Sequence, residues 1–448
     1  MTAEPLSPKK AQPKKPCRPQ AARRKRLLAH IGEGVAVIPA ATEKMRNRDT
    51  PYPYRFDSDF WYLTAFPEPD AALVLADGRS ILFCREKDAA KEVWEGFRYG
   101  PEAAKEVFGF DAAFPFSSLE AQLPQLLADR SALWHSLGQD AESDARIIRA
   151  LNAVRGMCRT GKRPPARIHD VRQTLDAMRL IKDAAELVLM QEAADIAAAG
   201  HLRAMRACRP GKFEHELEAE LIYEFRRRGA AGHAYAPIVA GGGNACVLHY
   251  VENDKRLPDA GLVLIDAGCE VRGYAADISR TFPVNGRFSA VQKDCYEIVL
   301  AAQAAAVAAI RPGAGFDAPH VAAARILTQG MVDLRLLSGT VDGLVESGAY
   351  QRFYMHRTGH WLGLDVHDAG DYKQGETWVP LAPGMTLTVE PGLYIRPAAD
   401  VPEHLHNLGI RIEDDVVVTK RGCRVYTRAP KTVAEIEAAM QSGRAGAT

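Results

Sequence analysis

The chain has 448 residues, of which 47% are hydrophobic and 25% charged, and its formal net charge is +1. This length favours two domains over one, and the near-zero charge argues against a general nucleic-acid-binding role. No apolar run approaches the roughly 20 residues of a membrane span. The eight cysteines are scattered without a CxxC pair, which is typical of free thiols in a reducing compartment. We therefore expect a cytoplasmic globular protein that binds neither nucleic acid nor membrane.

Residues 1–26 are rich in proline, lysine and arginine and nearly lack apolar side chains. Such a segment buries too little surface to offset the entropy of ordering it, so we expect a disordered, solvated tail. An arm that touches nucleic acid, or a targeting peptide, is the alternative reading. No apolar stretch typical of a secretory signal follows cleanly.

From residue 27 onward, short apolar runs such as "GVAVIPA" and "AALVLADGRSILFC" alternate with helical stretches. This alternation predicts an α/β domain over residues 27–178. The polar, proline-rich segment Gly161–Asp170 leads towards the boundary, and Asp183 is a suitable N-cap for a long helix. A second domain is expected over residues 179–448.

The second domain contains a repeat. A long helix ending near Cys208 is followed by "RPG" and a second helix, and a long helix ending near Ile310 is followed by the same three residues. Proline and glycine end one helix and permit a sharp turn. Strands are expected after each helix pair, so the pattern predicts two α+β halves about a pseudo-twofold axis, with a site between them.

The stretch "LVLIDAGCEVRGYAADISRTF" (Leu262–Phe282) predicts a β-hairpin with its turn over Gly268–Gly273. Asp266 lies in the first apolar run and Asp277 in the second. An unpaired ionised carboxylate in an apolar strand carries a large desolvation penalty. The two aspartates therefore need a positive partner.

Further candidate ligands follow in three segments. "FYMHRTGHWLGLDVHD" carries three histidines, "LTVEPGLY" ends an apolar strand with a glutamate, and "GIRIEDDVVVT" places another glutamate inside a strand with an arginine two residues before it. The residues concerned are His356, His360, His367, Glu390, Glu413 and Arg411. Four carboxylates in apolar strands must be protonated or neutralised, and two divalent cations supply four positive charges. Oxygen ligands with one imidazole, that of His360, suit Mn²⁺, Co²⁺ or Zn²⁺. We expect a dinuclear metal centre.

The segments "LIDAGCEVRGYAADISRTFPV", "MHRTGHWLGLDVHD", "LTVEPGLY" and "IRIEDD" resemble motifs of the pita-bread (creatinase/aminopeptidase-like) metallopeptidases. "YPYRFDSDFWYLTAFPEPDA" is similar to the N-terminal domain of the aminopeptidase P (Xaa-Pro aminopeptidase) family. The resemblance covers nearly the whole chain beyond the tail. It implies a manganese-loaded aminopeptidase that hydrolyses the N-terminal Xaa-Pro bond by attack of a hydroxide bridging the two metals.

The resemblance also implies roles for individual residues. Asp266 binds one metal and His360 the other, Asp277 and Glu413 bridge them, and Glu390 completes the second site and acts as general base. His367 stabilises the tetrahedral intermediate, and His249 and His356 line the cleft. Arg411 pairs with a bridging aspartate, Tyr235 lies near the metals, and Trp94 matches the position of a residue that reaches the cleft from a neighbouring subunit. Fold-stabilising hydrogen bonds are the alternative for Tyr235 and Arg411, and an interface or core role for Trp94.

The expected substrates are peptides with proline at the second position, and the expected assembly is a homo-oligomer, a dimer or tetramer. A prolidase restricted to Xaa-Pro dipeptides shares the same five ligands and remains an alternative. A non-catalytic binding protein on the same fold is a further alternative, although loss of ligand residues, which would suggest it, is not observed. Creatinase-type relatives lack the metal carboxylates that are present here.

Overall fold

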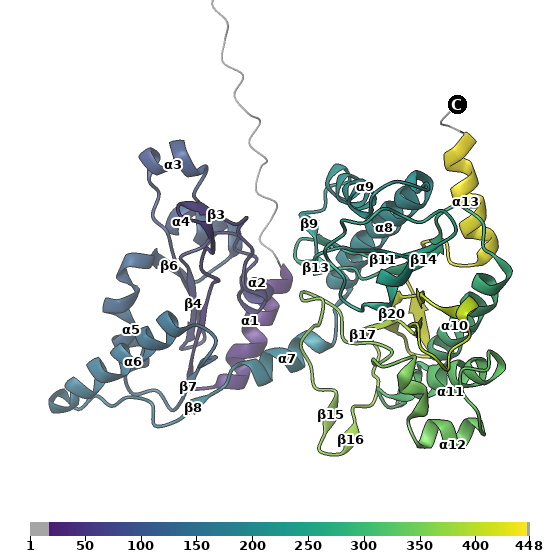
Figure 1. The fold of residues 1–448 in the computed structure, drawn as a ribbon. Coiled ribbons are helices and arrows are strands. Elements are labelled where there is room, and N and C mark those ends of the chain that lie inside the picture. The colour runs from purple at the N-terminus through teal and green to yellow at the C-terminus, as the bar shows by residue number, and fades with distance from the viewer. Residues whose placement is uncertain (1–17, 446–448) are drawn as a thin grey trace, which may run out of the picture. The chain divides into compact units, whose positions relative to one another are not determined.

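The computed structural model describes residues 18–445, which divide into two compact units (Figure 1). The first unit extends to Asp176 and the second starts at Ala177. This division and the boundary expected from the sequence, between residues 178 and 179, both fall within helix α7 (Arg172–Leu180). No helix within the described residues combines the length and apolar character needed to cross a membrane.

The first unit is built on a mixed six-stranded sheet with the order β6-β5-β4-β1-β7-β8. Strands β1, β4 and β5 pair antiparallel, and β6, β7 and β8 join them in parallel. The strands of this unit are β1 (Val35–Pro39), β2 (Met45–Asn47), β3 (Thr50–Pro51), β4 (Ala72–Ala76), β5 (Arg79–Cys84), β6 (Ala112–Pro115), β7 (Leu133–Trp134) and β8 (Ile168–His169). Its helices are α1 (Arg18–Ile31), α2 (Ser58–Thr64), α3 (Ala89–Glu95), α4 (Gly100–Phe108), α5 (Leu119–Leu127) and α6 (Ala141–Gly156). Side chains of β1, β4 and β5 share one buried core with α5 and α6, as expected of an α/β domain.

The prediction of a disordered tail over residues 1–26 is wrong for its last part, because helix α1 begins at Arg18. The residues before Arg18 lie outside the described part of the chain. Arg24 is buried and donates hydrogen bonds to Leu63 O at 2.9 Å, near the end of α2, and to Gly109 O at 2.6 Å, after α4. Carbonyl groups in the last turn of a helix lack partners within that helix. Arg24 therefore satisfies carbonyl groups near two helix ends of the first unit.

The second unit contains the predicted repeat. Helices α8 (Ala184–Ala207) and α9 (Glu214–Arg227) begin its first half, and α10 (Ala290–Ala309) and α11 (Ala318–Asp333) begin its second half. Asp183 caps α8 as predicted and forms a capping box with Glu186. The turns between the paired helices have the same backbone conformation at their glycines, because Gly211 and Gly313 have φ angles of 82° and 83°. Strands follow each helix pair, so the two predicted halves are present.

The strands of the second unit form several small antiparallel sheets, of which β10-β11-β14 belongs to the first half and β17-β20-β21 and β18-β19 to the second. They are β9 (Gly232–His233), β10 (Ile238–Gly241), β11 (Leu262–Asp266), β12 (Cys269–Val271), β13 (Tyr274–Ala275), β14 (Ser279–Pro283), β15 (Lys373–Gln374), β16 (Thr377–Trp378), β17 (Thr386–Val389), β18 (Gly392–Ile395), β19 (Leu408–Arg411), β20 (Asp414–Val418) and β21 (Cys423–Val425). Helices α12 (Val341–Glu346) and α13 (Val433–Ala445) complete the unit. Helices α8 and α9 contact strands of the first half and α10 contacts strands of the second, so the helices enclose the strands (Figure 1).

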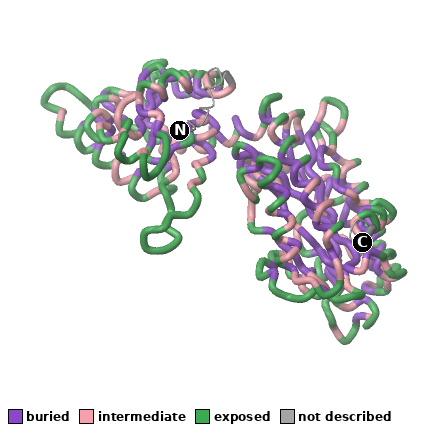
Figure 2. The backbone as a smooth tube through the Cα atoms, turned by 90° about the horizontal axis from the view of Figure 1, so that it is seen from above, coloured by how far each residue is buried: buried purple, intermediate pink, exposed green. Residues whose placement is uncertain are grey.

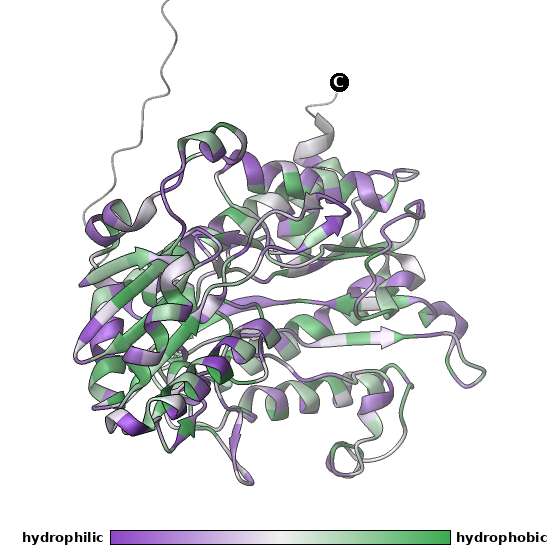
Figure 3. Ribbon diagram, turned by 90° about the vertical axis from the view of Figure 1, so that its left-hand side faces the viewer, coloured by the Kyte–Doolittle hydropathy of each residue, from purple (hydrophilic) through white to green (hydrophobic). Residues whose placement is uncertain are grey.

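Burial follows this layering. Strands β11, β14, β17, β18 and β20 are buried along nearly their whole length, whereas the β15–β16 hairpin is largely exposed. Figure 2 shows the same trend in the backbone, with buried residues inside each unit and exposed residues at its periphery. Hydrophobic residues are concentrated in the strands, while hydrophilic and hydrophobic residues alternate along the helices (Figure 3). Charged side chains that lie among these buried strands therefore need specific partners.

Candidate metal centre

The four predicted carboxylate ligands lie where strands end. Asp266 is the last residue of β11 and Glu390 directly follows β17, while Asp277 lies between β13 and β14 and Glu413 lies between β19 and β20. The expectation that Asp277 and Glu413 lie inside strands is therefore wrong. Inside a ladder the backbone groups are committed to neighbouring strands and side chains alternate between faces. At a strand end the backbone can turn, and the carboxylate is free to enter the cavity.

The predicted hairpin brings the two aspartates together. Strands β11 and β14 pair antiparallel with Asp266 opposite Ser279, while the turn region forms a smaller hairpin, β12–β13, that pairs with β9. Between them, Gly268 passes so close to the returning chain that a Cβ atom would lie 1.6 Å from Ala276 O. Only glycine permits this approach, which places Asp277 near Asp266.

The Tyr235 hydroxyl joins the two aspartates. It donates to Oδ1 of Asp266 at 2.6 Å and also contacts Oδ1 of Asp277. Burial and the adjacent carboxylates raise the pKa of Tyr235 well above its usual value. The hydroxyl therefore keeps its proton and remains a donor to the carboxylate pair.

Arg411 links three groups of the site. Its Nη2 donates to Oδ2 of Asp266 at 2.7 Å, its Nε to Oγ of Ser279 at 2.8 Å and its Nη1 to the Tyr394 hydroxyl at 3.0 Å. The Ser279 hydroxyl in turn donates to Oε2 of Glu413 at 2.8 Å. The expected pairing of Arg411 with a bridging aspartate is wrong, because its carboxylate partner is Asp266. Ser279 and Tyr394 were not predicted, although the hairpin register places Ser279 opposite Asp266.

His360 faces the carboxylates. Its Nε2 lies 3.5 Å from Oδ2 of Asp277 and 3.7 Å from Oε1 of Glu390, and its Nδ1 lies 3.0 Å from Trp361 O. A hydrogen bond from Nδ1 to a carbonyl leaves Nε2 as the free ligand atom. Ligand atoms of Asp277, His360 and Glu413 all lie within 4.8 Å of one another. This spacing suits coordination of a cation.

The titration behaviour of the cluster shows its excess negative charge. Burial raises the pKa of Glu390 to about 7, and burial together with the neighbouring carboxylates raises the pKa of Glu413 well above its usual value. Burial opposes a charged His360, yet Asp277 and Glu390 raise the pKa of this imidazole to about 9. In the protein alone, these protons offset part of the carboxylate charge. Divalent cations would replace them, so the residues present fit a metal centre.

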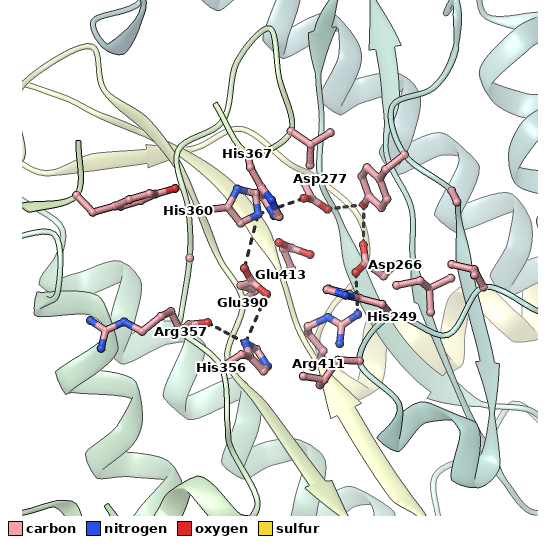
Figure 4. A pocket seen from close by; sticks show the side chains of 18 of the residues that line it. His249, Asp266, Asp277, His356, Arg357, His360, His367, Glu390, Arg411 and Glu413 are labelled. Atoms are coloured by element: carbon pink, nitrogen blue, oxygen red, sulfur yellow. Dashed lines mark hydrogen bonds and ion pairs between the residues drawn. The ribbon is translucent and has the colours of Figure 1, made fainter. Parts of the chain in front are cut away.

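The predicted histidines lie in the same cavity, which has a volume of about 970 Å³ and is lined by all five predicted ligands, Tyr235, Arg411, His249, His356 and His367 (Figure 4). Burial lowers the pKa of His356 to about 3, so this ring is neutral, and its Nε2 lies 2.8 Å from the Tyr394 hydroxyl. The ring of His367 packs edge-on against the ring of His360, with the two ring centres 4.2 Å apart. Trp94 does not line this cavity and lies on α3 of the first unit, where it is 89% exposed.

The loop that carries His249 has an anchor that the sequence analysis missed. Glu214, at the start of α9, is fully buried and accepts hydrogen bonds from Gly241 N at 2.8 Å, the Tyr250 hydroxyl at 2.8 Å and Lys255 N at 2.9 Å. One carboxylate thus holds both ends of the loop. The only sequence signal is an acidic residue in the first turn of a helix, which is common for other reasons.

Two family models match the chain: metallopeptidase family M24 over residues 188–420 and the N-terminal domain of aminopeptidase P over residues 20–134. The chain is 45% identical over 429 residues to a Xaa-Pro aminopeptidase of Escherichia coli strain K12, covering 94% of this chain and 97% of that protein. The structure of Pseudomonas aeruginosa aminopeptidase PepP matches with a TM-score of 0.95 and 48% identity over 97% of this chain and 100% of that one. The structure of Zn-substituted E. coli aminopeptidase P in complex with product matches with a TM-score of 0.93 and 44% identity, covering 96% of this chain and 100% of that one.

A pita-bread fold around a carboxylate-rich site defines a metallopeptidase. The chain belongs to metallopeptidase family M24 and, by its N-terminal domain and its nearly full-length relatives, to the Xaa-Pro aminopeptidases within it. The expectations of an α/β N-terminal domain, a pita-bread catalytic domain and a proline-specific metallo-exopeptidase are confirmed.

Proposed function

We propose that the chain releases the N-terminal residue from peptides with proline second, and that it does so with two divalent cations. The observation that carries this proposal is the convergence of four carboxylates and one imidazole on a single cavity. Two divalent cations balance four carboxylates, and an oxygen-rich set with one imidazole suits Mn²⁺, with Co²⁺ or Zn²⁺ as alternatives. The proposed ligands are Asp266, Asp277, His360, Glu390 and Glu413.

When bound, the cations supply Lewis acidity, which polarises the scissile carbonyl and lowers the pKa of water. Glu390 accepts a proton from the attacking water and returns it to the proline nitrogen as that nitrogen leaves. Burial raises the pKa of Glu390 in the metal-free protein to about 7, and bound cations would lower it, which keeps the carboxylate in the ionised form that accepts a proton.

The histidines assist the same step. His367, beside His360 in the cavity, donates a hydrogen bond to the oxyanion of the tetrahedral intermediate. His356 stays neutral, with Nε2 2.8 Å from the Tyr394 hydroxyl and Nδ1 2.8 Å from Arg357 O, so its ring lines the cleft without adding charge. His249 lines the cavity from the loop that Glu214 anchors. Tyr235 and Arg411 orient the aspartates.

We further propose a cytoplasmic homo-oligomer, a dimer or tetramer, in which Trp94 reaches the cleft of a neighbouring subunit. Trp94 is 89% exposed, and Val93 and Phe97 beside it are 81% and 59% exposed. Contiguous exposed apolar side chains mark interaction surfaces. Light scattering should give the mass of an oligomer for the wild type and a smaller mass for Trp94→Glu. A wild-type monomer would refute this assembly.

The test of the activity uses metal-stripped enzyme resupplied with Mn²⁺, Co²⁺ or Zn²⁺, together with a count of bound metal per chain. Release of the N-terminal residue from an Xaa-Pro-Ala tripeptide, with two metals bound per chain, supports the proposal. Cleavage of Xaa-Pro dipeptides alone would identify a prolidase with the same metal site. Absence of hydrolysis with metal bound would favour a binding protein on this fold.

A further inference from the structure

One part of the cavity wall carries a cation that has no carboxylate partner. Arg357 lines the cavity and its side chain is exposed, with its guanidinium carbon 4.7 Å from the centre of the Trp378 ring. The Lys373 ammonium group lies 4.5 Å from the centre of the same ring. Among residues 18–445, neither cation forms an ion pair with a carboxylate. Two cations on one indole ring, both without a counter-ion, make a local site for an anion.

The other charged groups of the cavity behave differently. Arg411 is buried and paired with Asp266, and the predicted metal ligands lie close to one another (Figure 4). Figure 4 shows the guanidinium group of Arg357 pointing away from Glu390 and the other carboxylates. The cavity therefore has two poles, a carboxylate cluster and a separate cationic edge.

This polarity matches the charge of a short peptide. An aminopeptidase holds the N-terminal end of its substrate at the reaction centre, so the chain beyond proline must extend away from it. A free peptide carries a carboxylate at its far end. The indole of Trp378 holds the plane of the guanidinium group, which leaves its N–H edge available for a carboxylate.

We propose that Arg357, stacked on Trp378 and supported by Lys373, forms an anion subsite for a carboxylate on the leaving side of the peptide. This inference rests on the proposed peptidase function. The carboxylate comes from the C-terminus of a short peptide or from an aspartate or glutamate side chain further along a longer one. Arg357 is thus a specificity-determining residue that adds affinity for acidic leaving groups.

The test compares peptides of the form Ala-Pro-(Ala)n, in a series of increasing length, as free acids and as C-terminal amides. Wild-type enzyme should show a kcat/KM roughly five- to tenfold higher for the acid than for the amide at the length that reaches Arg357. This ratio should fall as salt is added. Arg357→Gln should bring the ratio to about one, and Arg357→Lys should restore part of it because charge without the planar fork binds a carboxylate less well. Amidated peptides that end in aspartate or asparagine distinguish a side-chain carboxylate from a terminal one.

Arg352→Gln is the matched control. Arg352 is also an exposed arginine, and its guanidinium carbon lies 5.0 Å from the centre of the Phe353 ring. Unlike Arg357, it forms an ion pair, with its Nη1 2.6 Å from Oδ2 of Asp400, and it does not line the cavity. This variant should keep the wild-type ratio of acid to amide. Equal hydrolysis of acids and amides by the wild type at every length, or an unchanged ratio in Arg357→Gln, would overturn the subsite while leaving the peptidase intact. A metal-loaded wild type that hydrolyses no peptide would instead overturn the proposed function and the subsite with it.

Discussion

Asp368→Asn tests how the fold positions the proposed oxyanion donor. Asp368 directly follows His367, and its side chain is 1% exposed between two cations, Lys182 Nζ at 2.7 Å and Arg179 Nη2 at 2.6 Å. Burial alone would raise the pKa of Asp368, but Lys182 and Arg179 together hold it below its usual value. Because Lys182 is also 1% exposed, loss of the carboxylate charge leaves a buried ammonium group without a counter-ion.

Breaking a buried ion pair by removing one partner costs about 3–5 kcal/mol, so the free energy of unfolding in urea should fall by that amount. A carboxyl group with a lowered pKa stabilises the fold above its unfolded pKa of about 4, and this stabilisation is lost as the pH falls through its folded value. The difference between wild type and variant should therefore shrink below about pH 4. We also expect kcat to fall more than KM rises, because His367 is held next to this ion pair. The double variant Lys182→Met, Asp368→Asn should regain part of the lost stability, since it removes the unpaired charge.

Glu224→Gln provides the control for this prediction. Glu224 is a buried carboxylate on α9 that accepts from Arg227 Nε at 2.7 Å and Arg228 Nε at 2.5 Å, and it does not line the cavity. Its substitution should lower stability less, because both arginines are half exposed, and should leave kcat unchanged. An unfolding free energy for Asp368→Asn within about 0.5 kcal/mol of wild type would refute the ion-pair argument. Equal losses of kcat in the two variants would refute the link to His367.

The proposed metal centre gives three further predictions. Asp277→Asn should lower kcat/KM more than about 100-fold and weaken metal binding measured by calorimetry, because a proposed metal ligand would lose its charge; full activity would contradict the proposed two-metal mechanism. His367→Ala should lower kcat by about 100-fold with little change in KM, and a change in KM alone would exclude its role in the transition state. Metal affinity should rise with pH, because Glu390, with a pKa of about 7, and His360, with a pKa of about 9, must lose their protons when cations bind. Calorimetry in buffers of different ionisation enthalpy should show proton release between pH 6 and 9, and no release would contradict the proposed ligands.

The carboxylates that line the cavity could be singled out in the sequence because acidic residues next to apolar runs conflict with their surroundings. An aspartate after Leu264 and Ile265, or a glutamate after Val389, is costly to bury without a positive partner. That conflict is visible in the sequence without any knowledge of the third dimension. The helix repeat was visible for a different reason, since a proline followed by a glycine favours the end of a helix and a sharp turn after it.

Tyr235 and Arg411 were predicted beside the aspartates, but other supporting groups, such as Ser279 and Lys182, could not be predicted because their own positions are ordinary. Ser279 is a small residue in a strand and Lys182 is a lysine just before a helix. Neither setting indicates a special role. Their roles depend on partners far along the chain, as in the hydrogen bond between Arg411 and Ser279. The same limit explains the error at the N-terminus, where Arg24 looks like part of a solvated basic tail until α2 and α4 supply its carbonyl partners.

Backbone hydrogen bonds to other segments hold three of the proposed ligand residues in place. The N–H of Glu390 donates to Thr358 O at 2.8 Å, that of Glu413 to Ser279 O at 3.0 Å and that of Asp277 to Asp415 Oδ2 at 3.1 Å. Each of these bonds joins segments far apart in the chain, so the carboxylates are held together although they repel one another. Cations bound here would relieve this repulsion, while these hydrogen bonds hold the backbone in place by contacts that involve no metal. On this reasoning the metal-free enzyme should remain folded, and saturating metal should raise its unfolding free energy by RT ln(1 + [L]/Kd), about 2.7 kcal/mol at a hundredfold excess over Kd.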